Sequence, residues 1–484
     1  MSPLLLFGFV LAYFLVLLLV AYVTSRNANN ESFFIGNKNS NWMLVAFGMI
    51  GTSLSGVTFV SVPGTVAGSA FTYMQVVIGY FIGYIVIAYV LLPLYYRLNL
   101  TSIYNYLQQR FGFTAYKTGA LFFILSRTVG ATARLYLVIN VMQLFILDDL
   151  GVPFYITAIV ILLMILLYTF EGGVKTIVYT DTLQTSFMLL GLVVCVYYIM
   201  NHLGFSFGET MQALKEQGYT RMLNTDVNSR GFFLKQVLGG AFITVAMTGL
   251  DQEMMQKNIS VKTLGDSQKN IISFSVVLVF VNFLFLLLGG LLYLFAARQG
   301  LDVKGDDLFP TVVLSYLPPA IGIIFIIALI SALFPSADGA LTALTSSFCI
   351  DILGIRRRPG LDDAAQKRIR RRVHLSFTLV FLACILIFKW IDNKSIINII
   401  LDLAGYTYGP LLGLFAFGIL TRLNFPDTWR VTFICILSPV LCYLLSRVVA
   451  QYAGGFQIGI ELLVINGLLT FLGLLTISKK SMPA

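Results

Sequence analysis

Long apolar runs separated by short polar segments dominate the chain from end to end. Because an α-helix needs about 20 apolar residues to cross the hydrocarbon core of a bilayer, each run predicts one membrane span. The predicted spans cover residues 3–24, 42–62, 72–96, 119–147, 152–170, 179–201, 232–255, 270–297, 319–350, 374–391, 396–420, 430–449 and 457–477. The pattern therefore predicts an all-α integral membrane protein with about 13 transmembrane helices, in which residues 1–484 form a single transmembrane domain.

The polar segments predict how the chain is oriented. Arg26 and Lys38 follow the first span, Lys257 and Lys262 follow the seventh, and the densest basic run, residues 356–372, follows the ninth. If the spans alternate, these segments share one side of the membrane, and the positive-inside rule makes that side the cytoplasm. The N-terminus is then outside and the C-terminus cytoplasmic, which requires an odd number of spans. We interpret the basic run as a topology anchor in preference to a lipid-headgroup or partner site.

Composition supports a membrane protein and excludes several other classes. Hydrophobic residues make up 58% of the 484 residues and charged residues only 11%, with a mean hydropathy of +0.87, whereas a soluble domain carries about 25% charged residues. The net charge of +10 lies in short loops between spans, so no nucleic-acid partner is expected. Two histidines exclude a multi-histidine metal centre, and the five cysteines show no paired spacing.

Other classes are set aside on similar grounds. The first apolar run, Leu4–Val23, lacks a basic n-region and an Ala-x-Ala cleavage site, so we expect a retained span and not a signal peptide. The chain contains no metal-ligand cluster, nucleophile elbow or His-based acid–base pair, so an enzyme is not expected.

Two of the predicted helices are interrupted within the bilayer. The second span contains residues 51–58, GTSLSGVT, and the seventh contains Gly239-Gly240 and then residues 248–252, TGLDQ. Small hydroxyl residues between glycines either unwind and offer oxygens to an ion or solute or allow close helix packing; alone, the first segment fits both interpretations. Two interrupted helices five spans apart favour an inverted five-helix repeat, and hence a secondary transporter over a channel.

Arginines inside the fourth span are candidate functional residues because a charge buried in a bilayer is costly. Arg127 and Arg134 lie seven residues apart and so share one helical face. Arg134 is near the middle of the span, and an anionic substrate group is a natural partner because guanidinium binds carboxylate bidentately. The alternative for both arginines is a structural ion pair with an internal carboxylate.

Two carboxylates are also predicted to lie within the membrane. Asp181 opens the sixth span, and Asp338 lies inside the ninth, next to Pro335 and Ser336. Pro335 has no N–H and therefore frees a carbonyl near residue 331. Freed carbonyls, a serine hydroxyl and a carboxylate are hard oxygen ligands for a small cation. Polar lining without an ion is the alternative, and a desolvated carboxylate can equally carry a proton.

These segments resemble the sodium:solute symporter family, whose members include sodium–glucose, proline, pantothenate and sialic acid transporters. The resemblance covers nearly the whole chain and rests on five motifs in the family's order. They are Ser53-Leu54-Ser55-Gly56 with Pro63-Gly64; Gly172-Gly173 with Tyr179-Thr180-Asp181 and Gln184; Asp251-Gln252 with Gln256-Lys257; Ser336-Ala337-Asp338 with Phe348 and Asp351; and Gly405 with Gly409-Pro410-Leu411 and Gly413. Within the family, the pattern is most similar to the bacterial sialic acid branch.

The resemblance implies a LeuT-type core of two inverted five-helix repeats. Residues 3–24 would form an extra N-terminal helix, residues 42–201 the first repeat, residues 232–420 the second repeat, and residues 430–477 two C-terminal helices. The chain would then be a multi-pass protein of the bacterial inner (plasma) membrane. No obligate protein partner is expected.

The resemblance also implies two cation sites. Ligands of the first sodium site would be the carbonyls of Gly51, Leu54 and Ala332 and the hydroxyl of Ser336. Pro335 stands where the family has another serine, so one hydroxyl ligand is missing. A second site would use Asp181 together with Asp338 and would bind Na⁺ or a proton.

The implied function is sodium-coupled symport of a small carboxylated solute, with sialic acid (N-acetylneuraminate) as the best candidate. The residues expected to bind it are Ser53, Ser55, Thr58, Gln75 and Arg134. Alternatives are a sodium- or proton-coupled symporter of a neutral sugar, proline or a short carboxylate. From another class, a membrane-embedded solute sensor is possible in principle, but we expect no soluble output domain after residue 480.

Overall fold

The computed structural model describes residues 3–26, 29–170, 173–358, 360–391, 396–452 and 456–480, which are almost wholly helical. The first half contains α1 (Pro3–Ser25), α2 (Asn30–Ile35), α3 (Trp42–Ser53), α4 (Gly56–Gly64), α5 (Val66–Ser69), α6 (Tyr73–Val86), α7 (Leu92–Arg97), α8 (Asn105–Phe111), α9 (Phe113–Met142), α10 (Phe154–Thr169), α11 (Gly173–His202) and α12 (Phe207–Glu216). The second half contains α13 (Phe233–Thr244), α14 (Gln252–Ile259), α15 (Leu264–Arg298), α16 (Leu308–Thr311), α17 (Pro319–Ser347), α18 (Asp363–Ile391), α19 (Ile396–Leu420), α20 (Trp429–Tyr452) and α21 (Leu462–Ile477).

Short elements complete the chain. π-Helical segments are η3 (Ile87–Leu91), η4 (Gln143–Leu147), η5 (Val245–Gly249), η7 (Val312–Tyr316) and η8 (Phe348–Ile352), and 3₁₀ segments are η1 (Gly36–Lys38), η2 (Ala70–Thr72), η6 (Gly305–Asp307) and η9 (Ile355–Arg357). Strands β1 (Leu423–Asn424) and β2 (Lys479–Lys480) pair antiparallel. Gly172, part of one motif of the family resemblance, lies outside the described residues.

The helices have the length and composition of membrane spans. Within the described part of the chain, eight are long and apolar enough to cross a bilayer, or ten if each of two sharply bent pairs counts as one span. Three shorter apolar helices, Phe154–Thr169, Ala404–Leu420 and Leu462–Ile477, accompany them. The predicted class, an all-α membrane protein, is confirmed.

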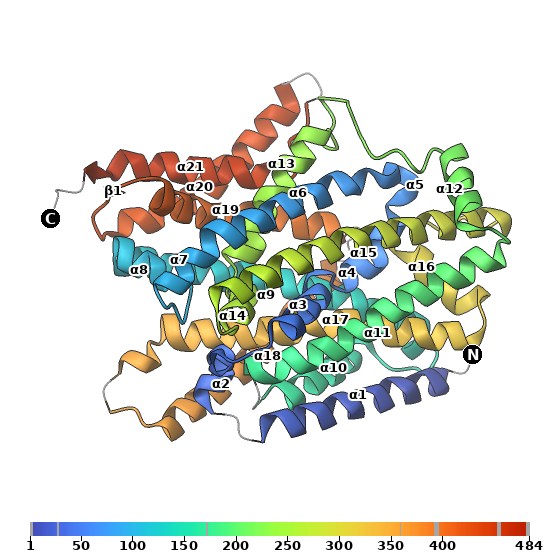
Figure 1. The fold of residues 1–484 in the computed structure, drawn as a ribbon, viewed down its shortest axis with the longest axis horizontal. Coiled ribbons are helices and arrows are strands. Elements are labelled where there is room, and N and C mark those ends of the chain that lie inside the picture. The colour runs from blue at the N-terminus through green and yellow to red at the C-terminus, as the bar shows by residue number, and fades with distance from the viewer. Residues whose placement is uncertain are drawn as a thin grey trace.

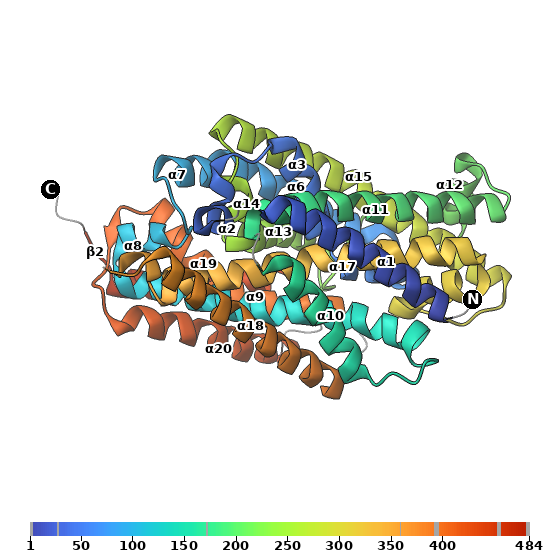
Figure 2. The same cartoon turned by 90° about the horizontal axis from the view of Figure 1, so that it is seen from below.

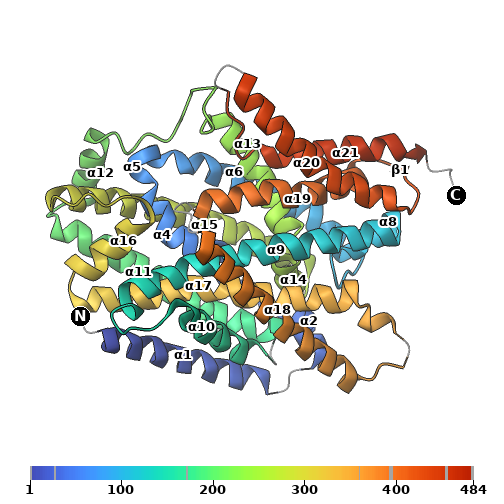
Figure 3. The same ribbon diagram turned by 180° about the vertical axis from the view of Figure 1, so that it is seen from behind.

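The long helices lie side by side along the long axis of the molecule (Figure 1). The N-terminus and α12 lie at one end, whereas α8 and the C-terminus lie at the other, as the views from below and behind also show (Figures 2 and 3). Among the spans, α17 is the most buried, and α3, α9 and α11 pack against it. A helix that is apolar on all sides suits this central position.

Both predicted interruptions are present as bends. α3 and α4 meet at 52°, and α13 with its extension η5 meets α14 at 66°. Contrary to the prediction, Gly239 and Gly240 take no part in the second bend, because both lie inside α13. A Cβ atom on Gly240 would collide with the backbone of Val76 on α6, so this glycine instead lets two helix backbones touch.

The charge pattern predicted Lys257 in a cytoplasmic loop, but the structure places it in a buried helix. α14 continues the seventh span to Ile259, and the Lys257 side chain is only 3% exposed. The start of α14 is stabilised by its N-cap residue, Asp251. The Asp251 carboxylate accepts hydrogen bonds from the backbone N–H groups of Glu253 at 2.9 Å and Met254 at 3.3 Å. One basic residue used to orient the chain is therefore a buried charge.

Candidate transport site

The break between α3 and α4 leaves backbone carbonyls without partners. Leu54 departs from helical geometry, with φ −88° and ψ 36°, and its N–H donates to the carbonyl of Ile50 at 2.8 Å. Among the described residues, no hydrogen bond ends on the carbonyl oxygens of residues 51–54. A helix C-terminus presents unsatisfied carbonyls and a partial negative charge, so this end of α3 is suited to binding a cation.

At the break before α14, in contrast, the backbone carbonyls have hydrogen-bond donors from the protein. Tyr95 donates its hydroxyl to the carbonyl of Gly249 at 2.7 Å, and Tyr104 donates to the carbonyl of Leu250 at 3.0 Å. These two carbonyls therefore have donors from the protein itself. The second break is closed by hydrogen bonds, whereas the first is open to a ligand.

α17 lines the other side of the first break. A Cβ atom on Gly51 would lie 3.5 Å from Cγ of Pro335, so these two residues are neighbours. The hydroxyl of Ser336 donates to the carbonyl of Leu333 at 2.9 Å, which leaves its lone pairs available to a cation. The predicted sodium ligands are all buried and lie on α3, in the break that follows it and on α17, which packs against α3: Gly51, Leu54, Ala332 and Ser336.

A polar cavity of about 130 Å³ adjoins this break. It is lined by four of the five residues predicted to bind the solute, namely Ser53, Ser55, Thr58 and Arg134. Three of them, together with Val57, surround the start of α4, so the positive end of that helix dipole lies at the cavity. A helix N-terminus and a guanidinium group together favour an anionic ligand.

The two arginines of α9 differ in their partners. Arg127 forms a buried ion pair with Glu253, and its Nη1 lies 3.8 Å from Oδ2 of Asp251. Arg134 also lines the cavity, but no hydrogen bond or ion pair to its side chain is present within the part of the chain that is described. Arg127 thus follows the structural interpretation, and Arg134 retains a guanidinium available to a ligand.

Gln75 does not line this cavity. Its amide nitrogen donates to the carbonyls of Thr72 at 3.0 Å and Gly231 at 3.2 Å, and its oxygen accepts the backbone N–H of Asn224 at 2.9 Å. The side chain therefore holds the polar segment between α12 and α13 against the start of α6. Its place differs from the prediction because a buried amide can serve a loop backbone as well as a solute.

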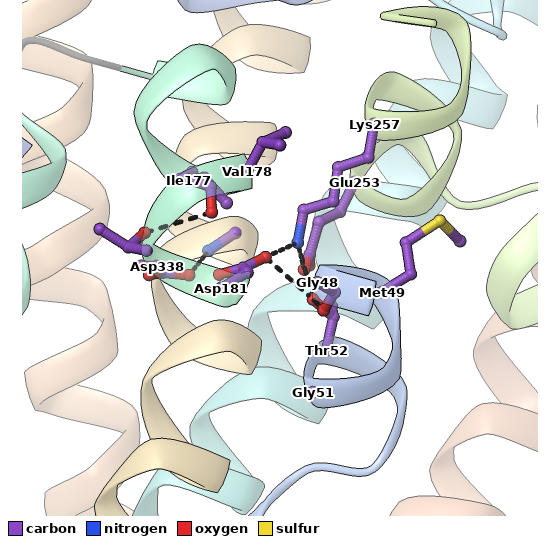
Figure 4. A network of polar contacts seen from close by, with 12 residues as sticks. Gly48, Met49, Gly51, Thr52, Ile177, Val178, Asp181, Glu253, Lys257 and Asp338 are labelled. Carbon is purple, nitrogen blue, oxygen red and sulfur yellow. Dashed lines mark hydrogen bonds and ion pairs between the residues drawn. The ribbon is translucent and has the colours of Figure 1, made fainter. Parts of the chain in front are cut away.

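Asp181 and Asp338 belong to one buried polar network (Figure 4). Oδ2 of Asp181 lies 2.7 Å from Nζ of Lys257 and accepts a hydrogen bond from the Thr52 hydroxyl at 3.2 Å. Oδ2 of Asp338 accepts the Tyr168 hydroxyl at 2.7 Å. The positive charge next to Asp181 is therefore supplied by the protein.

Comparison with known proteins agrees with this geometry. The sequence model of the Sodium:solute symporter family matches residues 33–425, which is well over half of the chain. The chain belongs to the sodium:solute symporter family. The resemblance inferred from the motifs is thereby confirmed, together with the multi-pass membrane character and the sodium-coupled transport that define this family of transporters.

Several relatives span most of this symporter. The sodium/sialic acid symporter SiaT of Proteus mirabilis is 21% identical over 431 residues, covering 86% of this chain and 84% of its own. Sodium/glucose cotransporter 1 of Oryctolagus cuniculus is 21% identical over 492 residues, covering 92% and 72%. The substrate-bound, outward-open structure of a Na⁺-coupled sialic acid symporter superimposes with a TM-score of 0.84 at 19% identity, covering 98% of this chain and 99% of that chain. This structural likeness shows a shared fold.

The cavity of the symporter is also lined by residues that were not predicted to bind the solute. They are Tyr73, Tyr80 and Tyr84 of α6, Thr244 and Thr248 of the seventh span, and Asn282 of α15. The tyrosines are seven and four residues apart, a spacing that places them on one helical face and is visible in the sequence. The threonines and the asparagine carry no such signal, because isolated polar residues in apolar runs also mediate helix packing.

Proposed function

We propose that this symporter carries a small carboxylated solute together with Na⁺, with sialic acid (N-acetylneuraminate) as the best candidate. One observation carries the proposal: among the described residues, the guanidinium of Arg134 faces a polar cavity and has no ion-pair partner. A charged side chain within a membrane span is costly unless it has a partner. A carboxylate that binds the guanidinium bidentately relieves that cost and also benefits from the N-terminus of α4.

Na⁺ and solute would bind at the same break. The solute carboxylate would be surrounded by the hydroxyl groups of Ser53, Ser55 and Thr58. The Na⁺ ligands would be the carbonyls of Gly51, Leu54 and Ala332 and the hydroxyl of Ser336. Because Leu54 lies between Ser53 and Ser55, both ligands stabilise one backbone conformation. Binding of either then favours binding of the other, which is the thermodynamic basis of symport.

The finer architecture is part of the proposal. Thirteen spans would form a LeuT-type core of two inverted repeats, residues 42–201 and 232–420, flanked by residues 3–24 and 430–477. The N-terminus would lie outside and the C-terminus in the cytoplasm of a bacterial inner membrane. Two bent helix pairs and termini at opposite ends of the molecule support this arrangement.

A neutral sugar is the second candidate, because the rabbit relative is a sodium/glucose cotransporter. A neutral sugar would leave the Arg134 guanidinium without a direct ion pair among the described residues, so we consider a carboxylated solute the better candidate. The sugar acid is favoured further by the Proteus mirabilis relative, a sodium/sialic acid symporter.

Uptake into proteoliposomes tests the proposed function. Radiolabelled N-acetylneuraminate should accumulate when an inward Na⁺ gradient is imposed and should not accumulate when K⁺ replaces Na⁺. The uncharged carboxamide analogue should compete poorly. Equal competition by acid and amide would contradict the carboxylate proposal, and binding without uptake would indicate a sensor.

A further inference from the structure

A buried ammonium group lies next to Asp181, the residue for which the family resemblance implied a second cation site. Nζ of Lys257 lies 2.7 Å from Oδ2 of Asp181, 2.7 Å from Oγ1 of Thr52 and 3.7 Å from Oε1 of Glu253 (Figure 4). All four residues are at least 95% buried. Two carboxylates and a hydroxyl thus surround one positive charge. Oxygen donors of this kind are what a hard cation such as Na⁺ requires.

The oxygens around Lys257 come from the elements that form the transport site. Thr52 lies in the last turn of α3, directly before Ser53 of the cavity lining, and Asp181 lies on α11. Glu253 and Lys257 lie on α14, directly after the second break. The ammonium therefore links both broken helices to α11, as an ion bound at this position would.

We propose that Lys257 is a tethered cation: its ammonium group takes the place of a second Na⁺ at Asp181, so that the chain binds a single Na⁺ from solution. This inference rests on the proposed function, which places that single Na⁺ at the break between α3 and α4. Asp181, for which a cation or proton site shared with Asp338 was predicted, would then bind a cation. Its cation, however, is part of the protein and is not transported.

The surroundings of Asp181 explain why loss of the lysine charge would recruit a replacement. Oδ1 of Asp181 has no hydrogen-bond partner among the described residues, and Asp338 lies in the same network with its own carboxylate. Without Lys257, Glu253 would still have Arg127 as its counter-charge, whereas Lys257 is the one basic partner of Asp181 among the described residues. Without the ammonium, Asp181 and the Thr52 hydroxyl would frame a vacated, cation-sized position.

Counting bound sodium tests this inference without any solute. Purified full-length protein is equilibrated with radiolabelled Na⁺, and the bound Na⁺ per chain is measured at saturation. The wild type should bind one Na⁺, Lys257→Met should bind two, and Lys257→Arg, which keeps the charge, should bind one. The double variant Lys257→Met/Asp181→Asn should return to one. A Lys257→Met protein that binds the same number as the wild type overturns the proposal.

Asp181→Asn alone decides the question if Lys257→Met does not fold. A tethered cation predicts that this variant still binds one Na⁺, because the lysine and not Na⁺ occupied the position. A fall from two Na⁺ in the wild type to one in Asp181→Asn overturns it. A wild type that binds no Na⁺ rejects the proposed sodium site itself, whereas a count of one in both wild type and Lys257→Met rejects only the tethered cation.

Discussion

At the scale of single residues, Arg134 is expected to determine selectivity for a carboxylated solute. Arg134→Ala should weaken binding of N-acetylneuraminate by about 2–5 kcal/mol, the range for removing one partner of a buried charge pair. Arg134→Lys should recover only part of this, because an ammonium cannot reproduce the bidentate guanidinium contact. Calorimetric titration of the purified proteins with the acid and with its carboxamide measures both effects. If the wild type binds the two compounds equally, Arg134 is structural.

Pro335 is expected to weaken the first sodium site. Pro335→Ser adds a hydroxyl next to Gly51 and restores a backbone N–H that the continuous helix α17 can accommodate. An added ligand worth about 1.4 kcal/mol would lower the Na⁺ concentration for half-maximal uptake about tenfold.

Pro335→Ala is the matched control, since it restores the N–H without a hydroxyl. Sodium dependence should tighten in the serine variant and not in the alanine variant. An identical shift in both would assign the effect to the helix backbone and not to a ligand.

The predictability of these residues follows from their chemistry. Arg134 stood out because a charge within a membrane span is costly and usually functional. Ser53, Ser55 and Thr58 were predicted only through the family resemblance, because hydroxyl groups in apolar runs also serve helix packing. Lys257 could not be identified, because it stands only two residues beyond the predicted end of its span, where a loop lysine is ordinary. Its burial depends on how far α14 continues, and periodicity does not fix a helix end.

At the scale of elements, the tyrosine hydroxyls at the second break should contribute to stability. Tyr104→Phe leaves the buried carbonyl of Leu250 without its donor, which should cost about 1–3 kcal/mol. The loss should appear as a lower thermal midpoint of the detergent-purified protein. Tyr155→Phe, which changes a hydroxyl on an exposed side chain of α10, is the control and should leave the midpoint unchanged. Equal midpoints for both variants would refute the structural role of the Tyr104 hydroxyl.

The ion pair between α9 and α14 should also stabilise the fold. Arg127→Met leaves Glu253 with only the more distant Lys257, and breaking a buried pair in this way costs about 3–5 kcal/mol. Asp302→Asn serves as the control, because both members of its pair with Lys304 are exposed, and such pairs contribute about 0–1 kcal/mol. In detergent, the thermal midpoint of Arg127→Met should be clearly lower than that of the control variant. Similar midpoints would show that Glu253 is readily neutralised by another route.

The two helix bends show how far a break in a helix can be predicted from the local sequence. Glycines and hydroxyl residues at 51–58 and 248–252 predicted both bends, because such residues tolerate an unwound backbone. The glycine pair at 239–240 wrongly predicted a break in the helix, because a glycine pair also allows two helices to pack closely. Which role applies depends on the neighbouring helix α6, and that neighbour is not visible in the local sequence.

For the whole molecule, the proposed orientation can be tested by cysteine labelling. The natural cysteines are buried or half-buried, so a new exposed cysteine should react selectively. Arg221→Cys, between α12 and α13, should react with a membrane-impermeant maleimide added to intact cells, and Arg368→Cys, in the basic run, should react only after the cells are opened. The reverse pattern would invert the predicted topology.

The class of the molecule was the most predictable property. The number of apolar residues per run is set by bilayer thickness, so membrane spans follow directly from composition. Their packing does not, because lipid and helix interior are equally apolar and hydrophobicity does not select neighbours. The central position of α17 and the polar cavity between α6, α9 and α13 therefore emerge only from the fold.

The contact between α6 and α13 has a consequence for reading alignments of this family. Cβ atoms at Gly79, Gly83 and Gly240 would collide with the backbone of the opposing helix. In a saturation mutagenesis library these positions should tolerate almost no substitution, although none of the three lines the cavity. Invariance there records how closely two helices must approach. Substrate preference should instead be sought at residues that line the cavity, such as Arg134.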